Sequence, residues 1–161
     1  DIQRMKTILM AVGTMADTSL RAVTEKMVER IEHFMPFEYR ELADVKATRS
    51  MTEERQKEAE EQRILASIGP GDCVMLLDER GKMLTSREFA DDVQRKMLTL
   101  QRNLVFIVGG PYGFSPAVYA RANGRLALSR MTMTHEMARM FFAEQLYRAV
   151  TIIKGLPYHH D

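Results

Sequence analysis

The stretch IVGGPYGFS, residues 107–115, has the residue types of a ligand-binding turn. It follows the apolar run 104–108 and contains Gly109, Gly110 and Gly113. Glycines let a ligand approach backbone N–H and C=O groups, and ligands of open α/β sheets bind at the carboxyl ends of strands. The stretch therefore predicts a turn that could take an adenosine group. A plain strand-to-helix turn is the alternative.

The glycine spacing excludes two phosphate-binding motifs. It reads G-G-x-x-G instead of G-x-G-x-x-G, Pro116 lies where a helix would begin, and no acidic residue follows at about twenty positions to hold a ribose. No Gly-Lys-Ser/Thr sequence follows either, as a P-loop would require. The turn therefore favours an adenosine moiety without phosphates.

Four apolar runs alternate with stretches of helical period, and together they must position this turn. Because strands and helices alternate along the chain and the core strands are fully apolar, we expect a parallel sheet with helices on its faces. The expected strands are 7–12, 37–42, 73–77 and 104–108, and the expected helices are 18–34, 51–68, 86–100 and 135–153.

Capping residues predict where two of these helices begin. Ser50 with Glu53, and Thr85 with Glu88, have the spacing of a capping box. The charged run 53–63 interleaves both signs and is typical of a solvated helix face.

The last helix, 135–153, carries apolar residues on more than one side. One face can cover the sheet, and the other needs a second surface to bury it. Because symmetric dimers are the commonest oligomers, a second copy of the chain is the economical partner.

Length and composition limit the class of protein. The 161 residues predict one domain with a real hydrophobic core. Lys and Arg number 23 against 22 Asp and Glu, so the overall basic charge of an autonomous nucleic-acid binder is missing and any basic surface must be local.

The one cysteine, Cys73, excludes a disulfide framework and indicates a buried thiol in a reducing compartment. No stretch reaches about 18 apolar residues, so we expect no membrane span.

Four segments carry a resemblance to a known family: the glycine turn VGGPYG, LLDERGKMLTSREFA (76–90), LALSRMTMTHEMARMFFAEQLYRA (126–149) and the terminal PYHHD. In these residues the chain resembles the RlmH family of SPOUT methyltransferases. The resemblance runs from Met5 to the end of the chain, and residues 1–4 look like an addition before the family's start.

The resemblance implies an α/β fold in a single domain, 1–161, with a SPOUT-type open parallel sheet flanked by helices. It also implies a C-terminal deep trefoil knot formed by about residues 104–161, which composition and periodicity do not indicate. The family forms homodimers that bind S-adenosylmethionine and methylate N3 of a pseudouridine in large-subunit rRNA on the assembled ribosome. An enzyme that reads a whole ribosome can take its specificity from shape and a local patch, which fits the weak net charge. We therefore expect a cytoplasmic protein, or one of the organelle matrix in a eukaryote.

The resemblance places the S-adenosylmethionine site in three parts of the chain. A flat adenine ring needs apolar walls and backbone hydrogen bonds more than it needs charge. Without the resemblance, the apolar members of the last part would be interpreted as ordinary core residues. The implied residues are Leu77, Gly109, Leu128, Ser129, Arg130, Met131, Thr132 and Met133.

The resemblance also implies catalytic roles for Arg148, Tyr158 and His159. A sulfonium methyl group is already electrophilic, so the enzyme must hold the attacking nitrogen in line and help to remove its proton. His159, with Tyr158, would contact the base and assist proton loss, because imidazole titrates near neutral pH. Arg148 would orient a phosphate or a base oxygen. The alternatives are a frayed C-terminal tail and an ion pair between Arg148 and Glu144, four residues earlier.

His135, Thr134 and the adjacent histidines near the C-terminus are interpreted separately. His135 either lines the cofactor loop or makes a structural hydrogen bond. Thr134 stands where the family usually has proline, so a softer loop and lower cofactor affinity are expected, although threonine is a good helix cap. We expect no metal site, because His159 and His160 are adjacent and no cysteine or carboxylate cluster completes a ligand set.

Two other functions stay open from the sequence. A non-catalytic SPOUT-like ribosome assembly or binding factor would keep the fold but would not be stabilised by the cofactor. A small flavodoxin-like nucleotide or flavin domain would need phosphate-binding donors in the first strand-to-helix turn, AVGTMADTS (11–19).

Overall fold

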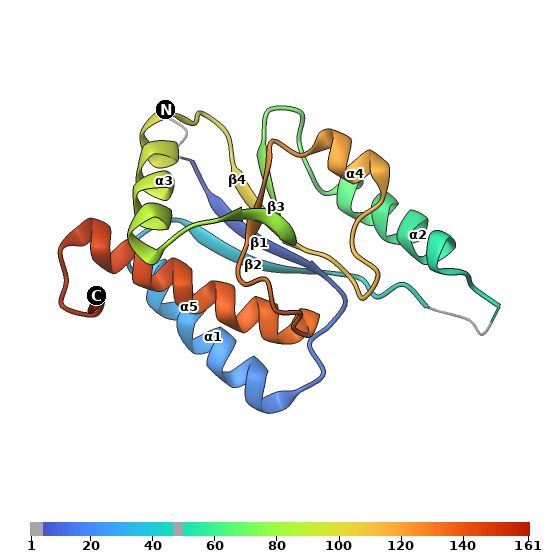
Figure 1. Cartoon of the computed structure of the whole chain (residues 1–161), viewed down its shortest axis with the longest axis horizontal. Helices are drawn as coiled ribbons and strands as arrows, with labels where there is room; N and C mark the ends of the chain where they lie inside the picture. Colours follow the sequence, from blue (N-terminus) through green and yellow to red (C-terminus); the bar gives the residue numbers. More distant parts are fainter. Residues whose placement is uncertain (1–4, 47–49) are drawn as a thin grey trace.

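The computed structural model describes residues 5–46 and 50–161, in which five strands alternate with five helices (Figure 1). The strands are β1 (Thr7–Val12), β2 (Phe37–Leu42), β3 (Cys73–Met83), β4 (Leu104–Val108) and β5 (Gly124–Ala127). The helices are α1 (Thr18–Glu32), α2 (Glu53–Ala66), α3 (Ser86–Thr99), α4 (Pro116–Arg121) and α5 (His135–Lys154).

The strands form one parallel sheet in the order β2-β1-β4-β3-β5. The predicted α/β class with an open parallel sheet is therefore confirmed. The sequence prediction missed α4 and β5, because a six-residue helix and a four-residue strand are too short to show a period. It also ended β3 at Leu77, whereas the strand continues to Met83.

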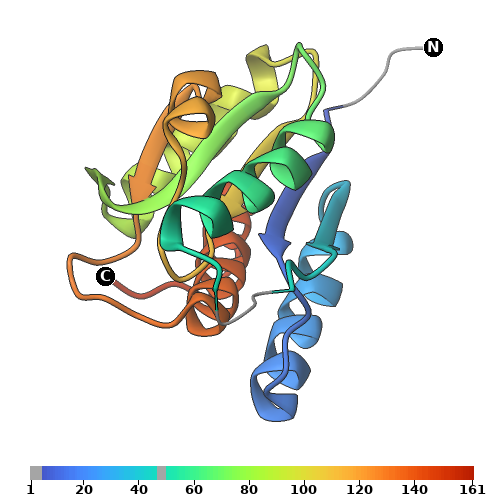
Figure 2. The ribbon, with the colours of Figure 1, turned by 90° about the vertical axis from the view of Figure 1, so that its right-hand side faces the viewer.

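Helices cover both faces of the sheet (Figures 1 and 2). Successive side chains of a strand point to opposite faces. Leu9 and Phe106 therefore join the cluster that contains Phe142 of α5, and the Phe106 and Phe142 ring centroids lie 4.6 Å apart. Met10 and Ile107 join the opposite cluster, beneath α2 and α4. This arrangement fixes α5 on one face and α2 on the other.

Capping residues set the starts of the helices, and one predicted cap is wrong. Thr85 and Glu88 form the predicted capping box at the start of α3. At α2 the N-cap is Thr52, which accepts the N–H of Arg55 at 3.2 Å, instead of Ser50. Because the helix begins directly after Thr52, Ser50 lies outside its first turn.

The same local chemistry sets both ends of α5. Thr134 accepts the N–H of Met137 at 3.2 Å, which confirms its predicted role as a cap. Gly155 ends the helix with a φ of 71°, in the left-handed region that favours glycine. The start of the helix next to the predicted cofactor loop is thus well defined without proline at position 134.

The part of β3 that follows Leu77 continues to pair with β5, but in a shifted register. Both Leu77 and Lys82 lie opposite Leu126, so the residues between them form an irregularity in β3. A Cβ atom on Gly81 would lie 2.7 Å from backbone atoms of Arg125 and Leu126, so this close approach requires glycine. The trefoil knot expected for about residues 104–161 stays a prediction.

Three smaller predictions have different outcomes. Cys73 has a free thiol but is only partly buried, because it opens β3; burial still raises the pKa of the thiol. The proposed N-terminal addition, 1–4, lies outside the described residues. In the two described ranges, no helix combines the length and apolar character needed to cross a bilayer.

Candidate active site

The predicted cofactor residues come from the carboxyl ends of three neighbouring strands. Leu77 of β3 pairs with Val108 of β4 on one side and with Leu126 of β5 on the other. Gly109 follows Val108 directly, and the segment 128–133 follows β5. The register therefore brings all three parts to one edge of the sheet, which we call the cofactor edge.

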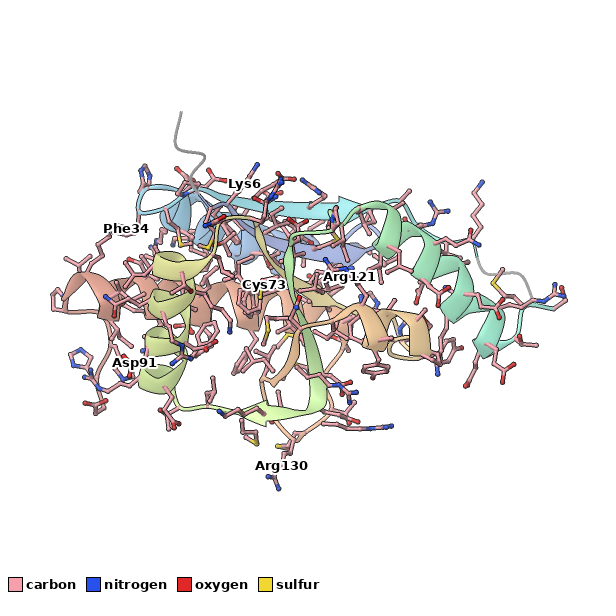
Figure 3. The ribbon with its side chains drawn as sticks, turned by 90° about the horizontal axis from the view of Figure 1, so that it is seen from above. Lys6, Phe34, Cys73, Asp91, Arg121 and Arg130 are labelled. Atoms are coloured by element: carbon pink, nitrogen blue, oxygen red, sulfur yellow. The ribbon has the colours of Figure 1, made fainter. Side chains whose placement is uncertain are left out.

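The extension of β3 holds the segment 128–133 in place. Thr132 Oγ1 donates to Glu79 Oε2 at 3.2 Å, and Arg130 Nε lies 3.2 Å from the sulfur of Met83. Figure 3 shows the Arg130 side chain pointing away from the body of the molecule. The segment is thus anchored to β3 while its arginine stays exposed.

The apolar residues of this segment do not have the same role. Leu128 packs against the core cluster of α5, so the interpretation as a core residue holds for it. The Met131 residue is 79% exposed, and its N–H donates to Ser129 Oγ at 3.0 Å. A methionine this exposed is not part of the core. It is available to line a ligand site.

The glycine turn after β4 is compact and leads into a helix. Gly113 has a φ of 79° and donates its N–H to Gly110 O at 3.1 Å. A Cβ atom on Gly109 would meet the ring of Phe114 at 3.1 Å. Pro116 does not oppose a helix start, as the sequence suggested, because it occupies the first position of α4, where its missing N–H costs nothing.

Helix α2 brings a buried carboxylate to this turn. Glu60 is 5% exposed, so the predicted solvated face of 53–63 is wrong at this position. A Cβ atom on Gly110 would overlap the Glu60 carboxylate. Burial raises the pKa of Glu60. The signal that could have found it is Ile64, a buried residue four positions later on the same side of the helix.

Arg139 ties the first turns of α5 to the carboxyl end of β1. Its side chain is fully buried; Nη2 donates to Val12 O at 3.0 Å and Nη1 to Gly13 O at 2.9 Å. Nη1 also lies 3.1 Å from Glu41 Oε2. The role of Arg139 was not predicted from the sequence, although an arginine three positions before Phe142 on an apolar stripe is an unusual feature.

Glu41 gathers the donors around this buried arginine. Besides Arg139, it accepts hydrogen bonds from Met15 N at 2.9 Å, Tyr39 OH at 2.8 Å and Arg21 Nη2 at 3.1 Å. Burial alone would raise the pKa of Glu41, but these hydrogen bonds outweigh it and lower the pKa. Burial raises the pKa of Tyr39 to about 12. An ionised, well-partnered carboxylate therefore supports the start of α5.

His135 belongs to the same network. Its Nδ1 accepts from Arg139 Nη2 at 3.3 Å, because a guanidinium can only donate. Burial and the neighbouring Arg139 lower the pKa of His135. Of its two predicted roles, the structure shows the hydrogen bond that holds the helix start.

The predicted catalytic residues Arg148, Tyr158 and His159 meet around Glu144. Arg148 Nη2 lies 2.5 Å from Glu144 Oε1, and Tyr158 OH donates to the same oxygen at 3.0 Å. Arg148 Nη1 lies 3.2 Å from His159 Nδ1, and its guanidinium is 4.8 Å from the Tyr158 ring centroid. The tail is therefore not frayed, and the alternative ion pair with Glu144 is present as well. We call these four residues the tail cluster.

His159 uses both ring nitrogens in this arrangement. Because Arg148 can only donate, Nδ1 is the acceptor and Nε2 carries the proton. Nε2 lies 3.1 Å from Asp161 Oδ1, which also accepts from Arg87 Nε at 2.7 Å. The hydrogen bond from Arg87 lowers the pKa of Asp161. To accept a proton, His159 must first release Arg148 from Nδ1.

The cofactor edge and the tail cluster lie at different positions along α5. His135 follows the segment 128–133 almost directly, whereas Arg148 stands thirteen residues further along the helix. At 1.5 Å per residue this separation is about 20 Å. Figure 1 shows the C-terminus beside the far end of α5. One chain therefore does not bring its own tail cluster to its own cofactor edge.

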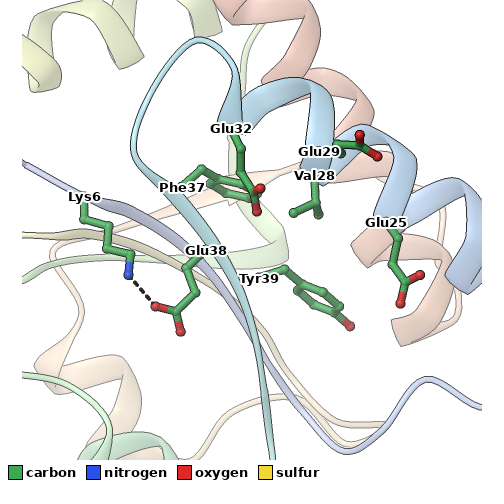
Figure 4. Close-up of a pocket in the computed structure, with 8 residues that line it drawn as sticks. All are labelled: Lys6, Glu25, Val28, Glu29, Glu32, Phe37, Glu38 and Tyr39. Carbon is green, nitrogen blue, oxygen red and sulfur yellow. Dashed lines mark hydrogen bonds and ion pairs between the residues drawn. The ribbon is translucent and has the colours of Figure 1, made fainter.

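Two cavities lie away from all the predicted site residues. One, of about 360 Å³, opens between α1 and β2 (Figure 4). Its charged lining is mostly acidic, and its one lysine, Lys6, pairs with Glu38 at 2.6 Å. The other, of about 450 Å³, lies beside α3 and the strands β3 and β5. Neither lining includes a residue of the cofactor edge or the tail cluster.

A family model described as "Predicted SPOUT methyltransferase" matches residues 5–159. The chain belongs to the SPOUT methyltransferase family. The match begins at Met5 and ends at His159, so it covers both the cofactor edge and the tail cluster. The family membership expected from the motifs is confirmed.

Curated relatives of this SPOUT methyltransferase match it over their whole length. A protein of Porphyromonas gingivalis (strain ATCC 33277) named ribosomal RNA large subunit methyltransferase H is 46% identical over 157 residues, which cover 98% of this chain and 100% of that protein. Proteins of the same name from Cytophaga hutchinsonii and Bacteroides thetaiotaomicron are 47% and 44% identical. Those alignments cover 97% and 98% of this chain, and 100% of each relative.

A solved structure has the same general fold. The crystal structure of a probable rRNA-methyltransferase from Porphyromonas gingivalis superposes with a TM-score of 0.50 at 12% sequence identity. The superposition covers 94% of this SPOUT methyltransferase and 71% of the other chain. At this identity the likeness supports the α/β fold and nothing further.

Proposed function

We propose that this SPOUT methyltransferase transfers a methyl group from S-adenosylmethionine to N3 of a pseudouridine in large-subunit rRNA, on the assembled ribosome. The observation that carries the proposal is the similarity, at 44–47% identity and over the full length of the relatives, to proteins named as large-subunit rRNA methyltransferases. The cofactor edge and the tail cluster supply a place for each part of the reaction.

The residues of the cofactor edge suit an adenosine group. Leu77 and the exposed Met131 offer apolar surface, and Gly109, which is only partly buried, has no side chain to cover its backbone. The segment 128–133 adds backbone N–H and C=O groups for hydrogen bonds. When bound there, S-adenosylmethionine supplies an electrophilic methyl group.

The tail cluster supplies the groups that handle the base. Methyl transfer forms a bond to N3 and releases the N3 proton, so an acceptor for that proton is required. His159 is that acceptor once Arg148 turns from Nδ1 to an oxygen of the substrate. Tyr158 contacts the base, and Glu144 holds Arg148 and Tyr158 in position.

A second copy of the chain completes the site in this proposal. The separation of about 20 Å along α5 keeps the tail cluster from the cofactor edge of the same chain. The residues Val23 of α1 and Met137 of α5 remain 43% and 38% exposed, which leaves apolar surface on the two helices for a partner. A homodimer in which each tail reaches the partner's cofactor edge satisfies both observations.

Recognition of RNA then depends on a local basic surface. Arg80, Arg125 and Arg130 are exposed around the cofactor edge, whereas the cavity between α1 and β2 is mostly acidic. A ribosomal substrate would approach the basic side and be read by shape. We place this activity in the cytoplasm, or in the organelle matrix in a eukaryote.

Mass spectrometry of ribosomal RNA tests the proposal. Ribosomes from cells that lack the protein are incubated with the purified protein and S-adenosylmethionine. We expect one methyl group to appear on a pseudouridine of the large-subunit RNA. If S-adenosylmethionine binds but no methyl group is transferred to ribosomes, the non-catalytic assembly factor becomes the better function.

The first strand-to-helix turn argues against a flavodoxin-like phosphate site. Its N–H groups already donate to carboxylates: Thr14 N to Asp44 Oδ1 at 3.2 Å and Met15 N to Glu41 Oε2 at 2.9 Å. Asp17 caps the following helix. Carboxylates in these positions would repel a phosphate, which needs free N–H donors there.

A further inference from the structure

The inward side of α2 carries two polar residues one helical turn apart, Gln56 and Glu60. Gln56 Nε2 donates to Glu60 Oε2 at 3.2 Å. Glu60 is 5% exposed and lies against the backbone of Gly110, in the glycine turn after β4. Because Gly110 has no side chain, the carboxylate reaches the turn itself.

Two acceptor atoms of this pair lack a partner among residues 5–46 and 50–161. They are Glu60 Oε1 and Gln56 Oε1, and both are buried. A buried acceptor without a donor costs about 1–3 kcal/mol, and an ionised one costs more. The raised pKa of Glu60 has the same cause, since burial penalises the charged form. The pair is therefore unfavourable for the chain alone, as is common where a protein keeps groups for a ligand.

We propose that Glu60 and Gln56 accept hydrogen bonds from the α-ammonium group of S-adenosylmethionine. The inference rests on the proposed function, which puts the cofactor at Gly109, directly beside Gly110. An ammonium group carries three N–H donors and a positive charge, which match two free acceptor oxygens of which one is anionic. Binding would then satisfy both oxygens and neutralise the buried carboxylate.

Other ligands match this pair less well. A phosphate would be repelled by the carboxylate. A hard divalent cation takes about six oxygen ligands, and no group of three or more metal-ligating side chains gathers in the described parts of the chain. A ribose hydroxyl would satisfy one acceptor and leave the negative charge uncompensated.

Titration with two nucleosides tests the assignment. S-adenosylhomocysteine carries the ammonium group, whereas 5′-methylthioadenosine lacks the whole amino-acid part. Affinities are measured by calorimetry for the wild-type protein, Glu60→Gln and the control Glu58→Gln, which changes an exposed glutamate of the same helix. We expect Glu60→Gln to weaken S-adenosylhomocysteine about tenfold or more and to leave 5′-methylthioadenosine unchanged. Glu58→Gln should alter neither affinity.

Thermal unfolding of the ligand-free variants provides a second measurement. Glu60→Gln removes a buried charge that has no opposite charge beside it, so its melting temperature should rise above that of the wild type. Equal weakening of both nucleosides, or no weakening of either, would overturn the assignment of Glu60. Failure of the wild-type protein to bind S-adenosylmethionine and S-adenosylhomocysteine would instead overturn the proposed function, and the assignment with it.

Discussion

The cofactor edge and the tail cluster differ in what satisfies their polar groups. The edge offers the backbone of the glycine turn and an exposed segment in which Met131 is 79% accessible. In the tail cluster, Arg148, Tyr158 and His159 already bond to one another or to Glu144. In the proposed function, a ligand would therefore reach the exposed Met131 directly, whereas the tail cluster would have to exchange hydrogen-bond partners before it contacts a base. Binding and chemistry should then be separable by mutation.

Truncation before Tyr158 should have the largest effect, because it removes both proposed base-contacting residues. Loss of a positioned acid–base group costs about 10²–10⁴-fold in rate. We expect methylation of ribosomes to fall by at least this factor, while S-adenosylmethionine still binds at the cofactor edge. Mass spectrometry of the RNA and calorimetry of the cofactor measure the two properties separately.

A shorter truncation serves as the control for the first. Deletion of His160 and Asp161 keeps Tyr158 and His159 and removes the contacts of Asp161 with the imidazole and with Arg87. This variant should retain most of the activity. Full activity in the longer truncation would show that the tail cluster takes no part in the chemistry.

Arg139→Met should have the next largest effect, on stability instead of activity. The substitution leaves Glu41 and the carbonyl groups of Val12 and Gly13 without their buried donor. Removing one partner of a buried ion pair costs about 3–5 kcal/mol, and we expect the lower end because Glu41 keeps its contact with Arg21. Urea unfolding measures the change, with Arg55→Met on the exposed side of α2 as the control. A loss no larger than that of the control would mean that α5 needs no anchor at β1.

Regular patterns in the sequence predicted most of the fold. The runs 7–12 and 104–108 became strands that are buried between two helical layers, and their continuous apolar composition indicates this directly. Thr85, Glu88 and Thr134 predicted helix starts because capping depends on neighbours within one turn. β5 could not be predicted in this way. Its four residues form a strand because they pair with β3, whose Gly81 lies against the backbone of Arg125 and Leu126.

The candidate site residues also differ in how well the sequence predicted them. Leu77, Gly109 and the segment 128–133 were expected at one site, and the register of β3 with β4 and β5 brings them together. Glu60 and Arg139 were not expected, because a charged residue on a helix is normally solvated. Their burial follows from which side of α2 and α5 faces the sheet, and this depends on packing between distant parts of the chain.

Glu144→Gln should have a smaller effect, confined to the tail cluster. The amide keeps the shape of the side chain but loses the charge that holds Arg148 and Tyr158. Hydrogen bonds to charged groups contribute about 1.5–3 kcal/mol. We expect the single-turnover rate of methyl transfer to fall about tenfold or somewhat more, with the affinity for S-adenosylmethionine unchanged. Single-turnover assays on ribosomes measure this, and weaker cofactor binding would contradict the separation of the two regions.

Glu60 should produce the smallest effect, a pH dependence of stability that the tail cluster does not share. Its pKa is raised above the ordinary value of 4.5 because burial penalises the charged form. Between 4.5 and the raised pKa, the folded protein keeps a proton that the unfolded chain has lost, so stability decreases as pH rises through this window. Glu60→Gln lacks the group and should lose this component of the pH profile, whereas Glu58→Gln should retain it. Urea unfolding of the ligand-free variants across the window measures the difference, and parallel profiles for the wild type and Glu60→Gln would show that the carboxylate at the glycine turn is already compensated.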